Sequence, residues 1–367
     1  MPSPVTTLVA LSGALALICG PIHAAPLEAE LDRPDIKSAG ALAFGPDGIL
    51  LIGDQLGATI FAVATDDEAH AASAINIDDL GGKIAALFGT TSDDILIHDL
   101  AVHPESGRVY LSTSRGRGPD AIPVILRLGP GDSIEEFSLD NVAYTKATLP
   151  NAPDINAKSR RGASLRMEAI TDLAYFDGQV FVAGLSNEEF ASTLRSLDYP
   201  FGEVSRGSSV EIYHGAHGRY ETQSPIRTFM PLVIGGQPHL LAAYTCTPLV
   251  IIPIDQINTE SHVKGRTVAE LGNRNRPLDM ILYQKDGESY VLMANSSRGV
   301  MKITTDNIES IDTITSRIGG GGTAGLSYET IDSLKGVVQL DKLDETRAVV
   351  LIKEESGKLN LQTIDLP

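Results

Sequence analysis

Three aspartates occupy the same place in similar short phrases of the sequence. Asp99 begins "DLAV", Asp172 begins "DLAY" and Asp279 begins "DMIL", and Glu168 lies just before the second of them. Carboxylate oxygens from separate segments are ligands that Ca²⁺ accepts. Converging carboxylates also repel one another unless a cation or a proton lies between them. The sequence therefore leaves two alternatives: a site for Ca²⁺ or another divalent cation, or three aspartates that each cap their own turn.

Arginines form a second group of candidate residues. The phrase Ser-Arg-Gly ends both "VYLSTSRG" (109–116) and "YVLMANSSRG" (290–299), and Arg274 and Arg276 lie close together in "NRNRP". Planar guanidinium groups suit a carboxylate or phosphate ligand. The alternative is that these arginines pair with Asp99 or Asp279.

Both Ser-Arg-Gly phrases belong to a longer repeat. Each copy has a short apolar strand, a turn containing Gly, Pro or Asp, and a second strand, and a third strand follows most copies. The copies begin about 45 to 75 residues apart, a period typical of four-stranded propeller blades. They are "ALAFGPDGILLIGD" (41–54), "DLAVHPESGRVYLST" (99–113), "DLAYFDGQVFVAG" (172–184), "LVIGGQPHLLAAY" (232–244), "DMILYQKDGESYVLM" (279–293) and "VVQLDKLDETRAVVLI" (337–352). The sequence predicts an all-β fold, with one six-bladed β-propeller over residues 26–367. A seventh blade within 113–168 or 300–335 is the alternative.

Composition limits the classes of protein. The chain has 367 residues, of which 43% are hydrophobic and 21% charged, so it can bury a full core and is not disordered. Its formal net charge of −18 repels nucleic acid and anionic membranes. We therefore expect no nucleic-acid partner.

The first 25 residues resemble a signal peptide. The apolar run "LVALSGALALICG" (8–20) is followed by "PIHAAP", and it is too short to span a membrane. We therefore expect a periplasmic or secreted protein with no membrane insertion after the signal is removed. Cys246 is then the one remaining cysteine, and it is expected to be buried as a small apolar residue rather than to be reactive.

The repeat pattern, and "FGPDGILLIGD" (44–54) in particular, resembles the six-bladed propellers of the NHL and SMP-30/gluconolactonase type. This resemblance implies that the loop before each inner strand and the turn after each second strand lie on one face, around the central channel. It therefore implies a ligand site at the channel mouth, formed by His98, Arg115, Asn187, Tyr244, Arg276, Asn295 and Arg298. It also places the candidate metal ligands, Asp99, Glu168, Asp172 and Asp279, on that face. His98 would act there as a base or a ligand.

One segment departs from the strand pattern. In "SNEEFASTLRSLDYPFG" (186–202), Ser186 and Glu189 have the spacing of a capping box, and Phe190, Leu194 and Leu197 recur at helical spacing. The sequence predicts a short helical insertion over 186–197. It would stand over the channel mouth as a lid, or it would only cover apolar surface.

Two functions are consistent with these observations. The first is a propeller that binds a small anionic molecule or a partner protein at its channel mouth. The second is a metal-dependent hydrolase of the lactonase type, in which a divalent ion polarises a carbonyl group. The lactonase resemblance would require Glu-Gly-Pro at the first inner strand, and this chain lacks it. Binding is therefore the favoured function, and no catalytic residue is assigned.

Overall fold

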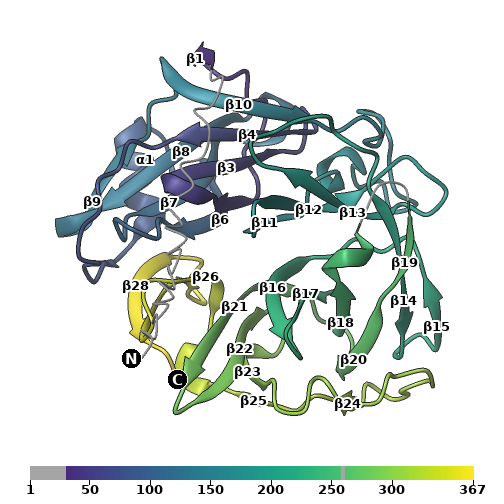
Figure 1. Ribbon diagram of the computed structural model, residues 1–367. Coiled ribbons are helices and arrows are strands. Elements are labelled where there is room, and N and C mark those ends of the chain that lie inside the picture. Colours follow the sequence, from purple (N-terminus) through teal and green to yellow (C-terminus); the bar gives the residue numbers. More distant parts are fainter. Residues whose placement is uncertain (1–29, 258–260) are drawn as a thin grey trace, which may run out of the picture.

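Six antiparallel sheets surround a common axis (Figure 1). The computed structural model describes residues 30–257 and 261–367, so the expected signal peptide lies outside the described residues. Within these ranges, no helix combines the length and the apolar character that a membrane crossing requires. The predicted all-β, six-bladed propeller is confirmed.

The inner strand of each sheet lies next to the channel, and each blade is named here by its inner strand. The inner strands are β2 (Leu42–Phe44), β6 (Ile95–Val102), β11 (Asp172–Phe176), β16 (Thr228–Ile234), β21 (Pro277–Lys285) and β26 (Val337–Lys342). They contact one another in a closed ring, in the order β2, β6, β26, β21, β16, β11 and back to β2. A closed ring of inner strands encloses a central channel.

The remaining strands extend each blade outward. The β2 blade adds β3 (Ile49–Asp54), β4 (Thr59–Ala64), β10 (Val142–Thr148) and β1 (Glu30–Asp32). The β6 blade adds β7 (Val109–Arg115), β8 (Ile122–Gly129) and β9 (Ser133–Glu136). The β11 blade adds β12 (Gln179–Leu185), β13 (Ser192–Asp198), β14 (Ser208–His214) and β15 (Arg219–Glu221), with β19 (His262–Lys264) beside β14.

The other three blades follow the same plan. The β16 blade adds β17 (Gln237–Ala243), β18 (Pro248–Pro253), β20 (Arg266–Leu271) and β24 (Thr323–Gly325). The β21 blade adds β22 (Glu288–Asn295), β23 (Gly299–Thr304) and β25 (Tyr328–Thr330). The β26 blade adds β27 (Arg347–Lys353), β28 (Leu359–Asp365) and β5 (Asn76–Ile77). Short 3-10 turns connect several strands: η1 (Pro46–Gly48), η2 (Ser92–Asp94), η3 (Gly118–Asp120), η4 (Pro130–Asp132), η5 (Arg166–Glu168), η6 (Ile254–Gln256) and η7 (Asp332–Leu334).

The blades do not follow the chain order around the ring. The β2 blade lies between the β6 blade and the β11 blade, although its inner three strands come first in the sequence. Its fourth strand, β10, is contributed by the chain after it has completed the β6 blade. The short strand β5 pairs with β28, so an early segment closes the last blade. Two blades, the β2 blade and the β26 blade, are thus each completed by a strand that is distant in sequence.

The two segments considered for a seventh blade belong to the six. Residues 113–168 supply β8, β9 and β10, which complete the β6 and β2 blades. Residues 300–335 supply β24 and β25, which form the outer edges of the β16 and β21 blades. Each of these segments therefore extends an existing sheet.

The core consists of apolar layers between neighbouring blades. Adjacent residues of the second strands, such as Leu240 and Leu241 in β17, are both fully buried. A strand covered on both faces needs apolar residues at every position, because blades pack against both sides of it. This explains the continuous apolar runs in the second strand of each copy.

The predicted helical insertion over 186–197 is wrong. Residues 192–198 form strand β13, which pairs with β12 along its whole length. Leu194 and Leu197 are buried in different apolar layers, on opposite faces of the sheet, and Phe190 is 42% exposed. Pairing with two neighbouring strands outweighed the helical spacing, since local propensity is weaker than tertiary context.

The α-helix of the described chain lies elsewhere, at α1 (Leu80–Phe88). The side chain of Asp79 caps its start by accepting a hydrogen bond from the Gly82 N–H. Gly89 ends it in the left-handed conformation, with φ of 64°. The two glycines near its start give "LGGKIAALF" a weak helical signal.

Candidate functional site

A polar cavity of about 250 Å³ lies at one mouth of the channel. The residues before the inner strands line it, together with the start of each inner strand. Its lining includes Gln55, His98, Asp99, Glu168, Asp172, Arg227, Thr228, Arg276, Asp279 and Gln339. The predicted site face therefore contains a cavity with both acidic and basic groups.

Three aspartates form the floor of this cavity, and each joins two neighbouring blades. Asp99 accepts a hydrogen bond of 2.7 Å from the Leu42 N–H, in the β2 blade. Asp279 accepts one of 2.9 Å from the Leu340 N–H, in the β26 blade. Asp172 makes the equivalent contact with the β16 blade. The second oxygen of each carboxylate accepts from the next N–H of its own strand.

A fourth aspartate continues this pattern deeper in the channel. Asp341 accepts hydrogen bonds of 2.7 Å from the N–H groups of Val102 and Lys342. Its link to Val102 joins the β26 blade to the β6 blade. The aspartates therefore connect neighbouring blades through hydrogen bonds.

Burial and mutual repulsion raise the pKa values of these carboxyl groups. Burial raises the pKa of Asp172 to about 7, although hydrogen bonds from backbone N–H groups oppose this shift. Burial raises the pKa of Asp341 to about 6. The pKa values of Asp99 and Asp279 lie well above the usual range, because both are buried and because the carboxyl groups repel one another. Burial thus disfavours the charged form of each of these carboxyl groups.

The wall of the cavity carries two arginines. Arg227 pairs with Glu168 through its Nη1 and also donates to Thr245 Oγ1 at 3.2 Å. Within the described part of the chain, the side chain of Arg276 has no hydrogen bond or ion pair. Burial, and next the charge of Arg227, lower the pKa of Arg276. The wall thus presents the guanidinium of Arg227, which is paired with Glu168, and the guanidinium of Arg276, which is free to bind an anion.

His98 also lines the cavity. Its Nε2 is 3.0 Å from Ser114 Oγ, and burial lowers its pKa. The Gln339 side chain donates to the His98 carbonyl at 3.0 Å. His98 is therefore a neutral imidazole near neutral pH, available as a hydrogen-bonding group.

Six of the predicted site residues line the cavity: His98, Arg276, Asp99, Glu168, Asp172 and Asp279. The other five do not. Tyr244 and Asn295 are buried in their blades, and the Asn295 side chain caps its own turn through the N–H groups of Ser297 and Arg298. Arg115 lies over the ring of Phe88, with 5.7 Å between its Cζ and the ring centre.

The remaining two also serve local structure. Arg298 donates to the carbonyl of Asn273 at 3.3 Å. Asn187 lies in an exposed loop, where its N–H donates to the Asn151 carbonyl. All five come from the turns that follow second strands. These turns are one strand further from the axis than the inner-strand loops that form the cavity.

Arg227, Thr228 and Gln339 line the cavity and were not among the predicted residues. Strand β16 begins at Thr228. The repeat begins the fourth copy at residue 232, so it leaves out Arg227 and Thr228. In the last blade, the register shifts between Val337 and Gln339, as it does between Pro277 and Asp279, so Gln339 occupies the position that Asp279 occupies in its blade. The repeat begins the sixth copy at 337, two residues before this equivalent position, and so does not single out Gln339.

The four predicted metal ligands do not form a compact group. Three His, Cys, Asp or Glu side chains could hold a metal ion together if their ligand atoms all lay within 4.8 Å of one another. Among the described residues, His214, His217 and Cys246 meet this condition. Glu168 pairs with Arg227, and each aspartate accepts backbone hydrogen bonds. A metal ion bound by Asp99, Glu168, Asp172 and Asp279 remains a prediction.

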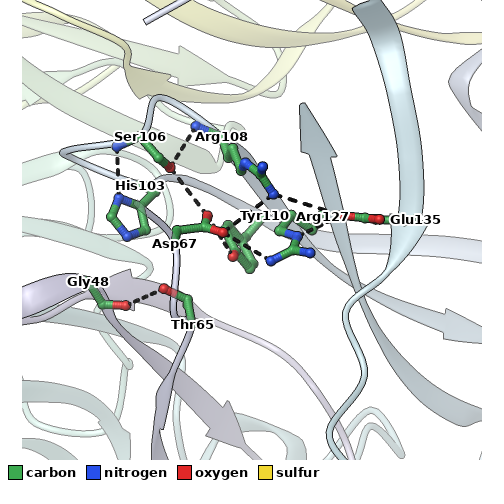
Figure 2. Close-up of polar contacts among 9 residues, drawn as sticks. All are labelled: Gly48, Thr65, Asp67, His103, Ser106, Arg108, Tyr110, Arg127 and Glu135. Atoms are coloured by element: carbon green, nitrogen blue, oxygen red, sulfur yellow. Dashed lines mark hydrogen bonds and ion pairs between the residues drawn. The ribbon is translucent and has the colours of Figure 1, made fainter. Parts of the chain in front are cut away.

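A second buried polar cluster lies at the opposite end of the propeller (Figure 2). The Asp67 side chain, 2% exposed, accepts hydrogen bonds from Tyr110 Oη at 2.9 Å and Arg127 Nη1 at 3.0 Å. Arg108 lies 3.4 Å from the same carboxylate. This cluster fixes the segment after β4 to the β6 blade. It is a structural network.

Comparisons with known proteins find similar chains among solved structures but no family. No family model and no curated protein matches the chain. Among solved structures, the chain is similar to a periplasmic gluconolactonase of Pseudomonas aeruginosa, with 10% identity and a TM-score of 0.33, over 89% of this chain and 85% of that chain. The assignment of the fold depends on the six sheets and on the closed ring of their inner strands. On that ground the chain is a six-bladed β-propeller.

Proposed function

We propose that this propeller binds a small anionic molecule in the cavity at its channel mouth. The observation that carries the proposal is the Arg276 side chain, which lines the cavity and has no hydrogen bond or ion pair within the described residues. A guanidinium with free donors is suited to a carboxylate or phosphate group. Arg227 adds a second cation beside it.

The raised pKa values of the floor support the same proposal. The chain as a whole is strongly acidic, with a formal charge of −18, and would repel an anion at long range. Within the cavity, burial and the repulsion between carboxyl groups raise the pKa values of Asp99 and Asp279 well above the usual range. This shift reduces the negative charge that the floor presents to the two arginines, and Glu168 pairs with Arg227. A bound anion would meet a locally favourable field.

A lactonase-type hydrolase is the second candidate function. The gathering of Asp99, Asp172 and Asp279 on the floor favours it, because a divalent cation placed there would relieve their repulsion. When bound, such a cation would polarise a substrate carbonyl as a Lewis acid. The cavity arginines would then orient an anionic part of the substrate.

The proposed location, the periplasm or the cell exterior, is based on the apolar segment 8–20.

Titration calorimetry with three probes, gluconate, succinate and inorganic phosphate, tests the binding proposal. We expect at least one probe to bind with one site per chain, and Arg276→Ala to weaken that binding. If none binds, or if Arg276→Ala binds equally well, the proposal is wrong. The hydrolase predicts instead a calcium-dependent hydrolysis of gluconolactone that a chelator abolishes and that Asp172→Asn reduces.

A further inference from the structure

His214, His217 and Cys246 converge at the rim of the propeller, outside the central cavity. His214 ends β14, His217 lies in the turn after it, and Cys246 lies in the turn between β17 and β18. One ligand atom from each residue lies within 4.8 Å of the other two. The two imidazole rings face each other, with 3.9 Å between their centres. Two blades, β11 and β16, therefore supply three nitrogen and sulfur donors at one point.

One carboxylate orients both imidazoles. The Nδ1 atoms of His214 and His217 lie 2.9 Å and 2.7 Å from the two oxygens of Glu221. Arg219 fixes this carboxylate from a third side, at 3.1 Å. An imidazole that donates its Nδ1–H to a carboxylate keeps its lone pair on Nε2. This is the arrangement by which carboxylates position histidine ligands of metal ions.

Two buried polar atoms at this place have no hydrogen-bond partner within the described residues. They are Nε2 of His214, a residue that is 2% exposed, and Oε2 of Glu270, which is 1% exposed. The other Glu270 oxygen accepts a hydrogen bond from the Gly215 N–H, in the turn that contains the histidines. Buried polar atoms normally find a partner, because an unpaired one costs free energy. A bound cation would satisfy a lone pair on His214 Nε2 and a lone pair on Glu270 Oε2.

The backbone presents Cys246 in an unusual conformation. Cys246 and Thr247 both have positive φ, 65° and 47°, and threonine rarely adopts such a value. The Cys246 N–H donates to the Asn275 carbonyl at 2.8 Å, and the Leu271 N–H donates to the Thr247 carbonyl at 3.0 Å. These contacts with the neighbouring loops hold the turn that contains Cys246 in place.

We propose that His214, His217 and Cys246 form a binding site for a divalent transition metal ion of the Zn²⁺ class. Two imidazoles and a thiolate suit Zn²⁺, whereas Ca²⁺ and Mg²⁺ prefer oxygen ligands. Glu270, which accepts a hydrogen bond from the Gly215 N–H next to His214, is a nearby oxygen donor. The side chain of His217 is 45% exposed, which leaves a path for the ion to enter. This site is distinct from the predicted calcium site of the channel, which uses aspartates.

Zinc binding to tag-free protein, stripped with a chelator and then dialysed, tests the proposal. We expect one Zn²⁺ per chain by elemental analysis and calorimetry. Cys246→Ser and His217→Ala should each weaken Zn²⁺ binding about tenfold or more, and Glu221→Gln should weaken it about tenfold to hundredfold. His239→Ala and Asp172→Asn are the controls, because these residues lie outside the cluster, and both should bind Zn²⁺ like the wild type.

Cobalt gives an independent readout of the thiolate. Protein loaded with Co²⁺ should show a sulfur-to-cobalt charge-transfer absorption that is absent from Cys246→Ser. Circular dichroism of each variant checks its fold. Because the His217 side chain is 45% exposed, His217→Ala should disturb folding least among these variants. The proposal is wrong if the wild type takes up no stoichiometric Zn²⁺, if folded His217→Ala binds it as tightly, or if excess Ca²⁺ displaces it.

Discussion

The carboxylate of Asp172 joins the β11 blade to the β16 blade. One oxygen accepts a hydrogen bond of 2.8 Å from the Leu173 N–H of its own strand, and the other accepts one of 2.8 Å from the Phe229 N–H of the neighbouring strand. The same carboxyl group forms part of the cavity floor. One residue thus supports both the closure of the ring and the charge of the proposed site.

Replacing Asp172 by Asn should change the stability of the protein in a pH-dependent way. Below pH 7 the wild-type carboxyl group is protonated and, like the Asn amide, directs one donor group at a backbone N–H, so the two proteins should differ by about 1 kcal/mol or less at pH 5. The folded-state pKa of about 7 lies above the unfolded value of 3.8, so the stability from the protonated wild-type carboxyl group is complete below 3.8 and is lost as pH rises through 7. The melting temperature of Asp172→Asn should therefore rise relative to that of the wild type from pH 5 to pH 8. Asp312→Asn, at an exposed position, is the control; a pH-independent difference would contradict the raised pKa.

Arg276→Ala should weaken the binding of whichever anion the wild type binds by about tenfold or more, because a charge-assisted pair of hydrogen bonds is lost. Arg298→Ala is a matched control, since Arg298 donates to Asn273 and does not line the cavity. Calorimetry of both variants measures the effect. Equal losses in the two variants would indicate a general electrostatic effect and no specific site.

Anion binding should weaken as pH rises from 6 to 8. Asp172 ionises with a pKa of about 7, and its negative charge then opposes the anion on the cavity floor. Gluconate suits this measurement because its own charge is constant over the range. In Asp172→Asn the dependence on pH should become flatter, and an unchanged pH profile would assign the effect to another group.

Glu168→Gln separates the two candidate functions. If the cavity binds anions, loss of this carboxylate frees Arg227 and should raise the affinity several-fold, while stability changes by about 1 kcal/mol or less, as for a partly exposed ion pair. If a divalent cation binds at the floor with Glu168 as a ligand, the same variant should lose that cation. Calorimetric titrations with gluconate and with Ca²⁺ distinguish these results.

Asp67→Ala should unfold more readily than any of the cavity variants. It leaves Arg108 and Arg127 without the carboxylate that lies between them, and breaking a buried pair of this kind costs about 3–5 kcal/mol. Chemical denaturation measures the loss. Anion binding by the folded variant should be unchanged, because this cluster lies at the other end of the propeller; altered affinity would show that the two ends are coupled.

The sequence by itself determined the blade architecture and the floor of the cavity. Each copy of the repeat contains a strand, a turn and a second strand rich in apolar residues, because the second strand lies between two blades. Asp99, Asp172 and Asp279 were identified because each begins a similar short phrase of this repeat, "DLAV", "DLAY" or "DMIL". These features depend on local patterns that repeat along the chain.

The tertiary structure alone decided which other residues meet. Arg227 joins Arg276 because two blades adjoin, and the pairing of β26 with β27 shows that Gln339 is equivalent to Asp279. The segment 192–198 became a strand because β12 and β14 flank it, and β10 and β5 complete blades that lie far away in sequence. His214, His217 and Cys246 are brought together by the packing of the β11 blade against the β16 blade. Such contacts join segments with no fixed separation in the chain, and the packing of the blades determines them.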